Sequence, residues 1–241
     1  MKGILGLLRS KTLVNKPKDE STDSMLFSTA FAGQGVDDSM LVPWEARAVE
    51  VGAKRLPASR GGKLLQGLWA KDKYMAHLDK DAVERMERFF EFASVPSNRD
   101  LIRQDEYGNF MVVLLTGTIA VDRVQPWGEQ LRLAETRPGD ILGEMSLLDS
   151  GIRFSACTTL TDCEIAVLSA EAMDEMMSKD PQLAASLVAL LARKLSLRLR
   201  GVSARLSDHQ KVTARKKYKS HPHQRVTMTP ERISDGTRSG Q

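Results

Sequence analysis

The sequence has few of the residues that build disulfide frameworks, metal centres or membrane spans. Its 241 residues include two cysteines and four histidines. Cys157 and Cys163 lack C-x-x-C spacing and fall in strand-like segments, which favours two buried, reduced thiols over a disulfide or a metal pair. No uncharged apolar run is long enough to cross a bilayer, and no small-residue cleavage site follows the short apolar run at residues 4–8. We therefore expect a cytoplasmic protein without a secretory signal.

Catalytic constellations are also missing. The sequence has no Walker loop, no zincin helix and no nucleophile elbow. The histidines lie in segments predicted to be helix or tail, away from any cysteine or serine that could form a catalytic set with them. The pattern of His221 and His223 favours a solvated pair in the tail over a metal site. We therefore expect neither an enzyme nor a metal protein. The four histidines are His77, His209, His221 and His223.

Positive charge is concentrated near the C-terminus. The formal net charge of +4 hides this asymmetry, because Asp208 alone opposes the basic residues between Pro181 and Arg225. Residues 193–225 could bind nucleic acid or an anionic membrane by releasing counterions, or could be a solvated tail. The basic residues are Arg193, Lys194, Arg198, Arg200, Arg205, Lys211, Arg215, Lys216, Lys217, Lys219 and Arg225.

Composition divides the chain into three parts. Residues 1–60 are rich in Lys, Ser, Asp, Gly and Thr and lack a sustained period, which predicts a mostly disordered region with short helices near 2–9 and 44–51. Residues 61–210 carry regular apolar periods and should form the folded domain. Residues 211–241 are basic and polar and are expected to be a disordered tail.

Within the folded part, the period changes from helical to strand-like and back. Apolar residues at helical spacing predict helices from residue 64, after Asp79, after Ser169 and from Pro181. The stretch between 91 and 168 holds short strands separated by Gly and Pro turns, which is typical of a jelly roll. The predicted fold is therefore α+β, a β-roll of about eight strands with N-terminal helices and a long C-terminal helix. The expected strands are residues 92–95, 101–103, 110–115, 119–124, 130–134, 154–159 and 164–168.

The long C-terminal helix carries one broad apolar stripe. A single roll cannot cover a stripe of this length, so we expect a homodimer through this helix, with packing on the chain's own roll as the alternative. Gly201 interrupts the pattern and could mark a bend. The stripe consists of Leu183, Leu187, Leu190, Leu191, Leu195, Val202 and Leu206.

One short segment has the chemistry needed to hold a sugar phosphate. Gly143 lets the backbone approach a ligand closely, and the turn that begins at Glu144 can direct free N–H groups at an anion. Arg153 supplies a permanent cation whose forked donors suit phosphate oxygens. Glu144, when ionised, can only accept hydrogen bonds, so it suits a sugar hydroxyl.

Two linked motifs give this segment a family resemblance. Residues 142–153 resemble the phosphate-binding cassette of cyclic-nucleotide-binding domains, the type found in the catabolite activator protein and in the regulatory subunits of cAMP-dependent protein kinase. Residues 101–117 resemble the first signature of the same family, with Gly108 and Gly117 at its expected glycines, and Pro138-Gly139-Asp140 matches the turn before the cassette. The resemblance covers about residues 65 to 206. It does not extend to a DNA-binding winged helix.

The resemblance implies a ligand and a role for each cassette residue. The ligand would be a cyclic nucleoside monophosphate, cAMP before cGMP, and no other cofactor is expected. Arg153 would pair with the exocyclic phosphate oxygens, Glu144 would accept from the ribose 2′-hydroxyl, and nearby backbone amides would complete the cradle. The base would lie near Leu131, Arg198 or Leu199. The implied ligand-binding residues are Gly143, Glu144, Met145, Ser146, Arg153, Phe154 and Ser155.

Two departures from the family pattern leave other functions open. Asp105 stands where the first signature usually has glycine, and Phe154 follows the arginine where the family has a small residue. A bulky ring there could reshape the phosphate pocket or point into the core. The expected function is an allosteric sensor that signals to an unknown effector protein. The alternatives are a protein interaction module without nucleotide affinity, a cyclic dinucleotide receptor, and a nucleic-acid-associated regulator acting through the basic tail.

Overall fold

The computed structural model describes residues 25–75 and 78–220. The predicted helix near residues 2–9, His77, and the tail from residue 221 with His221 and His223 lie outside the described residues. The chain divides after Leu191 into two units, and each is described by itself below.

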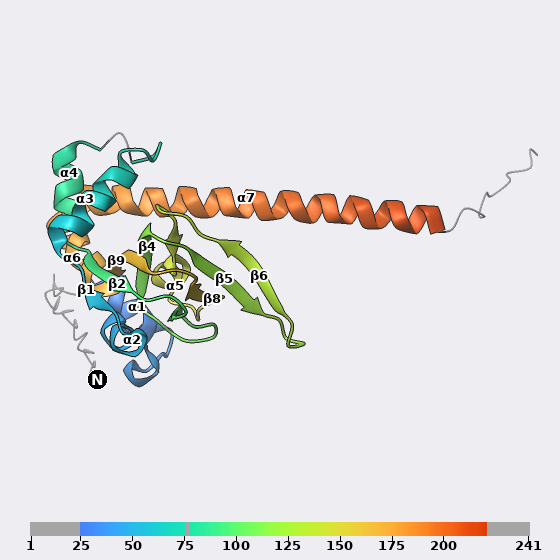
Figure 1. Cartoon of the computed structure of the whole chain (residues 1–241), viewed down its shortest axis with the longest axis horizontal. Coiled ribbons are helices and arrows are strands. Elements are labelled where there is room, and N and C mark those ends of the chain that lie inside the picture. Colours follow the sequence, from blue (N-terminus) through green and yellow to red (C-terminus); the bar gives the residue numbers. More distant parts are fainter. Residues whose placement is uncertain (1–24, 76–77, 221–241) are drawn as a thin grey trace, which may run out of the picture. The chain divides into compact units, whose positions relative to one another are not determined.

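Nine strands of the described chain form two antiparallel sheets, and Figure 1 shows where most of these strands lie. One sheet has five strands in the order β1-β2-β9-β4-β7, and the other has four in the order β3-β8-β5-β6. The first sheet comprises β1 (Lys54–Arg55), β2 (Glu91–Val95), β9 (Cys163–Ser169), β4 (Phe110–Thr116) and β7 (Ile141–Leu142). The second comprises β3 (Asp100–Ile102), β8 (Ala156–Thr159), β5 (Ile119–Val124) and β6 (Gln130–Glu135).

The predicted β-roll with N-terminal helices and a long C-terminal helix is confirmed. The seven expected strands correspond to β2, β3, β4, β5, β6, β8 and β9, with ends that differ by at most two residues. The two strands that were not predicted, β1 and β7, have two residues each, which is too short to show a period of two.

The position of strand β4 accounts for the unbroken apolar run at residues 110–115. Phe110, Val112 and Leu114 face the apolar cluster between the two sheets. Met111 and Val113 alternate with them and pack against the helices instead. Both faces of the strand are therefore buried, and neither face has room for a polar side chain. Cys157 and Cys163 are also buried, and no disulfide joins them.

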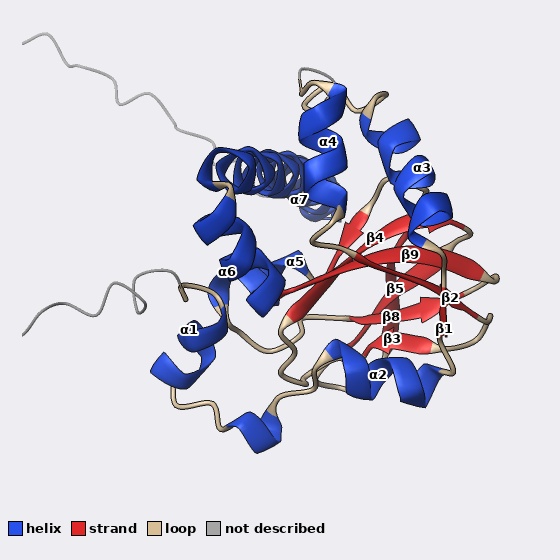
Figure 2. Cartoon of the chain, turned by 90° about the vertical axis from the view of Figure 1, so that its left-hand side faces the viewer, coloured by secondary structure: helices blue, strands red, loops and turns tan. Residues whose placement is uncertain are grey.

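Four helical segments cover the other face of the five-stranded sheet (Figure 2). Two of them begin at the residues predicted from the sequence: the Asp79 carboxylate accepts from the Ala82 N–H at 2.6 Å, and the Ser169 hydroxyl accepts from the Ala172 N–H at 3.1 Å. The segments are α3 (Ala58–Trp69), α4 (Lys80–Glu87), α6 (Ala170–Lys179) and the first turns of α7 (Pro181–Ser220).

The N-terminal region differs from the predicted disorder over residues 25–60. This stretch contains α1 (Ser28–Gly33), the 3-10 helix η1 (Asp38–Met40) and α2 (Trp44–Val51), and the helix expected near 44–51 is confirmed. Figure 2 shows α1 beside α6, and α2 beside β3.

Contacts with distant parts of the chain order this region. The buried Asp174 carboxylate accepts from the N–H groups of Phe27 and Ser28, both at 2.8 Å, and from the Ser28 hydroxyl at 2.6 Å. The Val42 N–H donates to the Tyr107 carbonyl at 2.9 Å. Because these partners are far away in the sequence, local composition could not reveal the fold of this region.

Helix α7 also extends further than expected. It continues to Ser220, so the first residues of the predicted disordered tail, 211–220, are helical. Lysine, a good helix former, is the most frequent residue of this stretch, and the helix passes through Gly201 without ending there. In the described part of the chain, no helix is long and apolar enough to cross a membrane.

Candidate functional site

A tight turn between β7 and α5 (Glu144–Asp149) places the cassette residues. Gly143 adopts a left-handed conformation, with φ 75°, just before the helix. A Cβ on Gly143 would lie 2.6 Å from Arg153 Nη1 and 2.9 Å from Ile102 Cδ1. Glycine is therefore required here both by the backbone angle and by the space that Arg153 occupies.

Replacement of Gly143 by alanine should therefore be costly. We expect Gly143→Ala to lower the free energy of unfolding by about 2–3 kcal/mol, because strain in the left-handed region adds to overpacking. Gly52 is the matched control: it is also left-handed, with φ 66°, but a Cβ there would meet nothing within 4 Å. Gly52→Ala should cost about 1 kcal/mol from strain alone. Equal losses for the two variants in urea unfolding would show that Arg153 does not crowd Gly143.

The Arg153 guanidinium is buried and held by neutral groups. Its residue is 3% exposed. Nη1 donates to the Gly143 carbonyl at 2.8 Å, and Nη2 donates to the Phe110 carbonyl at 2.7 Å. The guanidinium lies 4.7 Å from the centre of the Phe110 ring, in cation–π contact.

Burial alters the proton affinity of this arginine. It lowers the pKa of Arg153 to about 10, chiefly because the charged form loses its water. Glu144 and Glu106 partly oppose this shift. Arg153 therefore remains a cation at neutral pH, with a desolvation cost that backbone carbonyls offset only in part.

The structure brings Gly143, Glu144 and Arg153 together, but it directs the arginine inward. The hollow beside the Arg153 guanidinium, lined also by Phe110, is too small to admit a water molecule. The cassette motif predicts a guanidinium presented to phosphate, whereas in the structure Nη1 and Nη2 of Arg153 donate to carbonyls. Glu144 and Ser146 are both buried at the start of α5.

The remaining predicted site residues lie at the surface. Met145 and Phe154 are each about half exposed, and Ser155 is partly buried. The Arg123 guanidinium covers the Phe154 ring at 4.0 Å from its centre and donates to the Phe154 carbonyl. The ring therefore neither enters the core nor fills the hollow beside Arg153.

The first signature forms the loop that supports Arg153. The Asp105 N–H donates to the Arg153 carbonyl at 2.9 Å, and the Arg153 N–H donates to the Glu106 carbonyl at 2.8 Å. Asp105 has φ 65°, so aspartate adopts the left-handed conformation that the family's glycine would favour. At Gly108, a Cβ would lie 2.7 Å from Arg153 Nη2, so this glycine makes space for the guanidinium.

Sequence reasoning missed a second charged group next to this loop. Arg47 on α2 is 1% exposed and forms ion pairs with Glu50, at 2.6 Å, and with Glu106. Trp44, one turn earlier, packs edge-on against the Phe110 ring that lies beside Arg153. No local signal marks these residues, because their region has the composition of a disordered tail.

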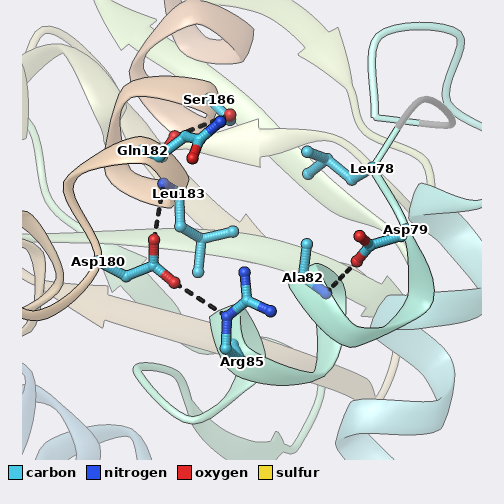
Figure 3. Close-up of a pocket in the computed structure, with 8 residues that line it drawn as sticks. All are labelled: Leu78, Asp79, Ala82, Arg85, Asp180, Gln182, Leu183 and Ser186. Carbon is cyan, nitrogen blue, oxygen red and sulfur yellow. Dashed lines mark hydrogen bonds and ion pairs between the residues drawn. The ribbon is translucent and has the colours of Figure 1, made fainter.

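A larger cavity lies away from the cassette. It occupies about 400 Å³ between α4 and the start of α7, and Figure 3 shows its lining residues. At its rim, Arg85 Nε pairs with Asp180 at 2.9 Å, and this bond lowers the pKa of the Asp180 carboxyl. None of the predicted ligand-binding residues lines it. Among the described residues, no group of three or more His, Cys, Asp or Glu could hold a metal ion.

The fold and the site together define a β-roll domain in which a buried arginine lies beside a cassette that begins with a glycine. Comparison with known proteins supports this description. The family model of the cyclic nucleotide-binding domain matches residues 92–180. The cyclic AMP receptor protein of Thermus thermophilus is 31% identical over 107 residues, which cover 44% of this chain and 50% of that protein. The CRP-like cAMP-activated global transcriptional regulator of Mycobacterium tuberculosis is 24% identical over 118 residues, which cover 49% and 53%.

A solved structure supports the fold. A cyclic nucleotide-binding domain from Methylobacillus flagellatus aligns with a TM-score of 0.61 and 22% identity, covering 65% of this chain and 89% of that one. Residues 92–180 therefore match the cyclic nucleotide-binding domain, as the motifs predicted, and the solved structure shows the same fold. The chain spans about half the length of the curated relatives it matches.

Proposed function

We propose that this chain is a sensor that binds a cyclic nucleoside monophosphate, cAMP before cGMP, and passes the resulting change to a partner. The observation that carries the proposal is the state of Arg153, a buried cation whose Nη1 and Nη2 donate to the neutral carbonyls of Gly143 and Phe110 in the described part of the chain. A phosphate would neutralise this charge, which carbonyls cannot do. The family match of residues 92–180 indicates the class of ligand.

Each cassette residue then has a role in the proposed complex. Arg153 pairs with the exocyclic phosphate oxygens, and Glu144 accepts from the ribose 2′-hydroxyl. Backbone amides near Gly143, Ser146 and Ser155 complete the phosphate cradle. These roles rest on the family's motif at matching positions and on the adjacency of Gly143, Glu144 and Arg153 in the structure.

The inward position of Arg153 gives the sensor its proposed two states. The hollow beside the guanidinium has no room for a phosphate, so contact requires Arg153 or the cassette to move. Such a move would release the carbonyl of Phe110 in β4 and the carbonyl of Gly143 before α5. Ligand shifts the equilibrium between the two states by its difference in affinity for them.

Calorimetric titration with cAMP, cGMP and cyclic di-GMP tests the proposal. We expect saturable binding of a cyclic mononucleotide, with cAMP tighter than cGMP. Binding of cyclic di-GMP alone would replace the ligand class with a cyclic dinucleotide. Binding of none of the three would favour a protein interaction module that has lost nucleotide affinity.

The second unit supports a proposal about assembly. In α7 beyond Leu191, Leu199, Val202 and Leu206 are exposed, and with the partly buried Leu195 they follow the 4-3-4 spacing of a coiled-coil seam. This seam differs from the stripe predicted from the sequence, which did not include Leu199. We propose that two copies pair in parallel through this seam. In this pairing Arg198 of one copy would lie opposite Ser203 of the other copy. Arg198 would therefore not meet a second positive charge beside the seam.

The assembly proposal predicts a change in oligomeric state. Leu199→Asp should dissociate the dimer, raising its dissociation constant by at least about a hundredfold, since a charge in a coiled-coil seam loses its water. Leu197→Asp is the control, because Leu197 is similarly exposed but lies off the seam. Sedimentation equilibrium of both variants decides the matter. A monomeric wild-type chain, or a Leu199→Asp chain that remains a dimer, would contradict the seam.

A further inference from the structure

A buried ion-pair group joins the N-terminal region to the loop that supports the cassette. Arg47 on α2 pairs through Nη1 with Glu50 at 2.6 Å and through Nη2 with Glu106. Arg103 approaches the same carboxylates, pairing with Glu50 and lying 3.7 Å from Glu106. Arg47 is almost fully buried, whereas Arg103 is about half exposed. The pair with Arg47 is therefore less screened by water and holds Glu106 more strongly.

Glu106 is also a neighbour of Arg153. The Arg153 N–H donates to the Glu106 carbonyl at 2.8 Å, and the side chains of Arg47, Glu106 and Arg153 line one hollow. Glu106 acts on the charge of Arg153 through space, yet no ion pair forms between the two side chains in the described structure. The carboxylate of Glu106 is directed at Arg47 instead.

We propose that Arg47 is a positioning residue that withholds Glu106 from Arg153, and so keeps Arg153 available to an anionic ligand. Without Arg47, Glu106 would keep its weaker contact with the half-exposed Arg103, and its carboxylate could turn towards the buried Arg153 guanidinium and neutralise it. An internal ion pair of that kind would compete directly with a ligand phosphate for the same donors. Helix α2 thereby sets the ligand affinity of the cassette through Glu106. This inference rests on the proposed function.

The test uses the full-length chain, cAMP as the probe and isothermal titration calorimetry. Arg47→Met should weaken cAMP binding by about tenfold, the size of one charge-assisted hydrogen bond. Adding Glu106→Gln to Arg47→Met should restore the wild-type affinity, because a neutral amide no longer neutralises Arg153. Glu106→Gln alone should bind cAMP more tightly than the wild type.

The double variant separates positioning from a purely structural role. If Arg47→Met weakened binding only by loosening α2, Glu106→Gln would not repair it, and a double variant as weak as Arg47→Met would overturn the proposal. Arg47→Lys is the milder variant should Arg47→Met fail to fold. Lysine keeps the positive charge but lacks the forked donors of arginine, so the affinity of this variant for cAMP should fall about threefold. Unchanged affinity in both Arg47 variants would also overturn the proposal.

A measurement without ligand keeps the inference separate from the proposed function. The guanidinium nitrogen resonances of Arg153, assigned with Arg153→Lys, report its partners in ¹⁵N-labelled protein. They should shift in Arg47→Met and return in the double variant. A wild-type chain that binds no cAMP but shows this shift and reversal would refute the proposed ligand and support the role of Arg47. Resonances that stay the same in Arg47→Met would refute that role.

Discussion

Replacement of Arg153 by alanine is expected to weaken cAMP binding by at least about a hundredfold, and replacement by lysine by about tenfold. Alanine removes the charge, while lysine keeps the charge and loses the forked donors that match two phosphate oxygens. Because Arg153 also holds the carbonyls of Gly143 and Phe110, alanine leaves these groups unpaired, at a cost of about 1–3 kcal/mol in unfolding free energy. A cAMP affinity that falls in steps from arginine to lysine to alanine at position 153 is thus the diagnostic result.

A surface arginine serves as the control for the Arg153 series. The Arg60 side chain is 65% exposed and pairs with Glu164 at 2.7 Å, outside the cassette. Arg60→Met should leave cAMP affinity within about twofold of the wild type, since exposed ion pairs contribute little. Calorimetry of the three variants at one salt concentration gives the comparison. If Arg153→Ala bound cAMP as tightly as Arg60→Met does, the site assignment would be wrong.

Truncation of Trp44 should be the most destabilising of the proposed substitutions. We expect Trp44→Ala to lower the free energy of unfolding by about 3–5 kcal/mol, as is typical for a large buried aromatic side chain. Trp44 is 4% exposed, and its ring lies edge-on to Phe110 with 5.6 Å between ring centres. The cavity left by Trp44→Ala would lie beside the ring that Arg153 contacts, so cAMP affinity should also fall.

Val49 on the same helix provides the matched control for Trp44. It is 83% exposed, so Val49→Ala should change the unfolding free energy by less than about 0.5 kcal/mol. Urea unfolding, followed by tryptophan fluorescence and circular dichroism, measures both variants. Similar small losses for Trp44→Ala and Val49→Ala would show that residues 25–56 do not belong to the cooperative fold.

The fold could be predicted from the sequence wherever the signal was local. Strand β4 showed as an apolar run, the helices showed their starting residues, and the cassette lies within one short stretch from Gly143 to Arg153. Turn chemistry and periodicity suffice for features of this kind. The prediction was insufficient for residues 25–60, whose order depends on Asp174 and Tyr107, far along the chain.

The adjacency of the cassette residues could be predicted from the sequence, but the conformation of Arg153 could not, and the binding of a ligand by these residues stays a prediction. Spacing brought Gly143, Glu144 and Arg153 together correctly. The inward turn of the guanidinium depends on the Phe110 carbonyl, 43 residues away, and the charge that faces Glu106 comes from Arg47, 59 residues away from it. Phe154 illustrates the same limit, because the cation that covers its ring belongs to β5. Contacts between distant elements decide where a side chain points, and no local pattern encodes them.

A crystal structure of the chain with cAMP tests the central claim most directly. We predict that the Arg153 guanidinium leaves at least one of the carbonyls of Gly143 and Phe110 and forms hydrogen bonds with the cyclic phosphate oxygens, with Glu144 on the ribose hydroxyl. A structure at saturating cAMP with Arg153 still bound to both carbonyls, and with the nucleotide absent from the cassette or bound elsewhere, would contradict the account.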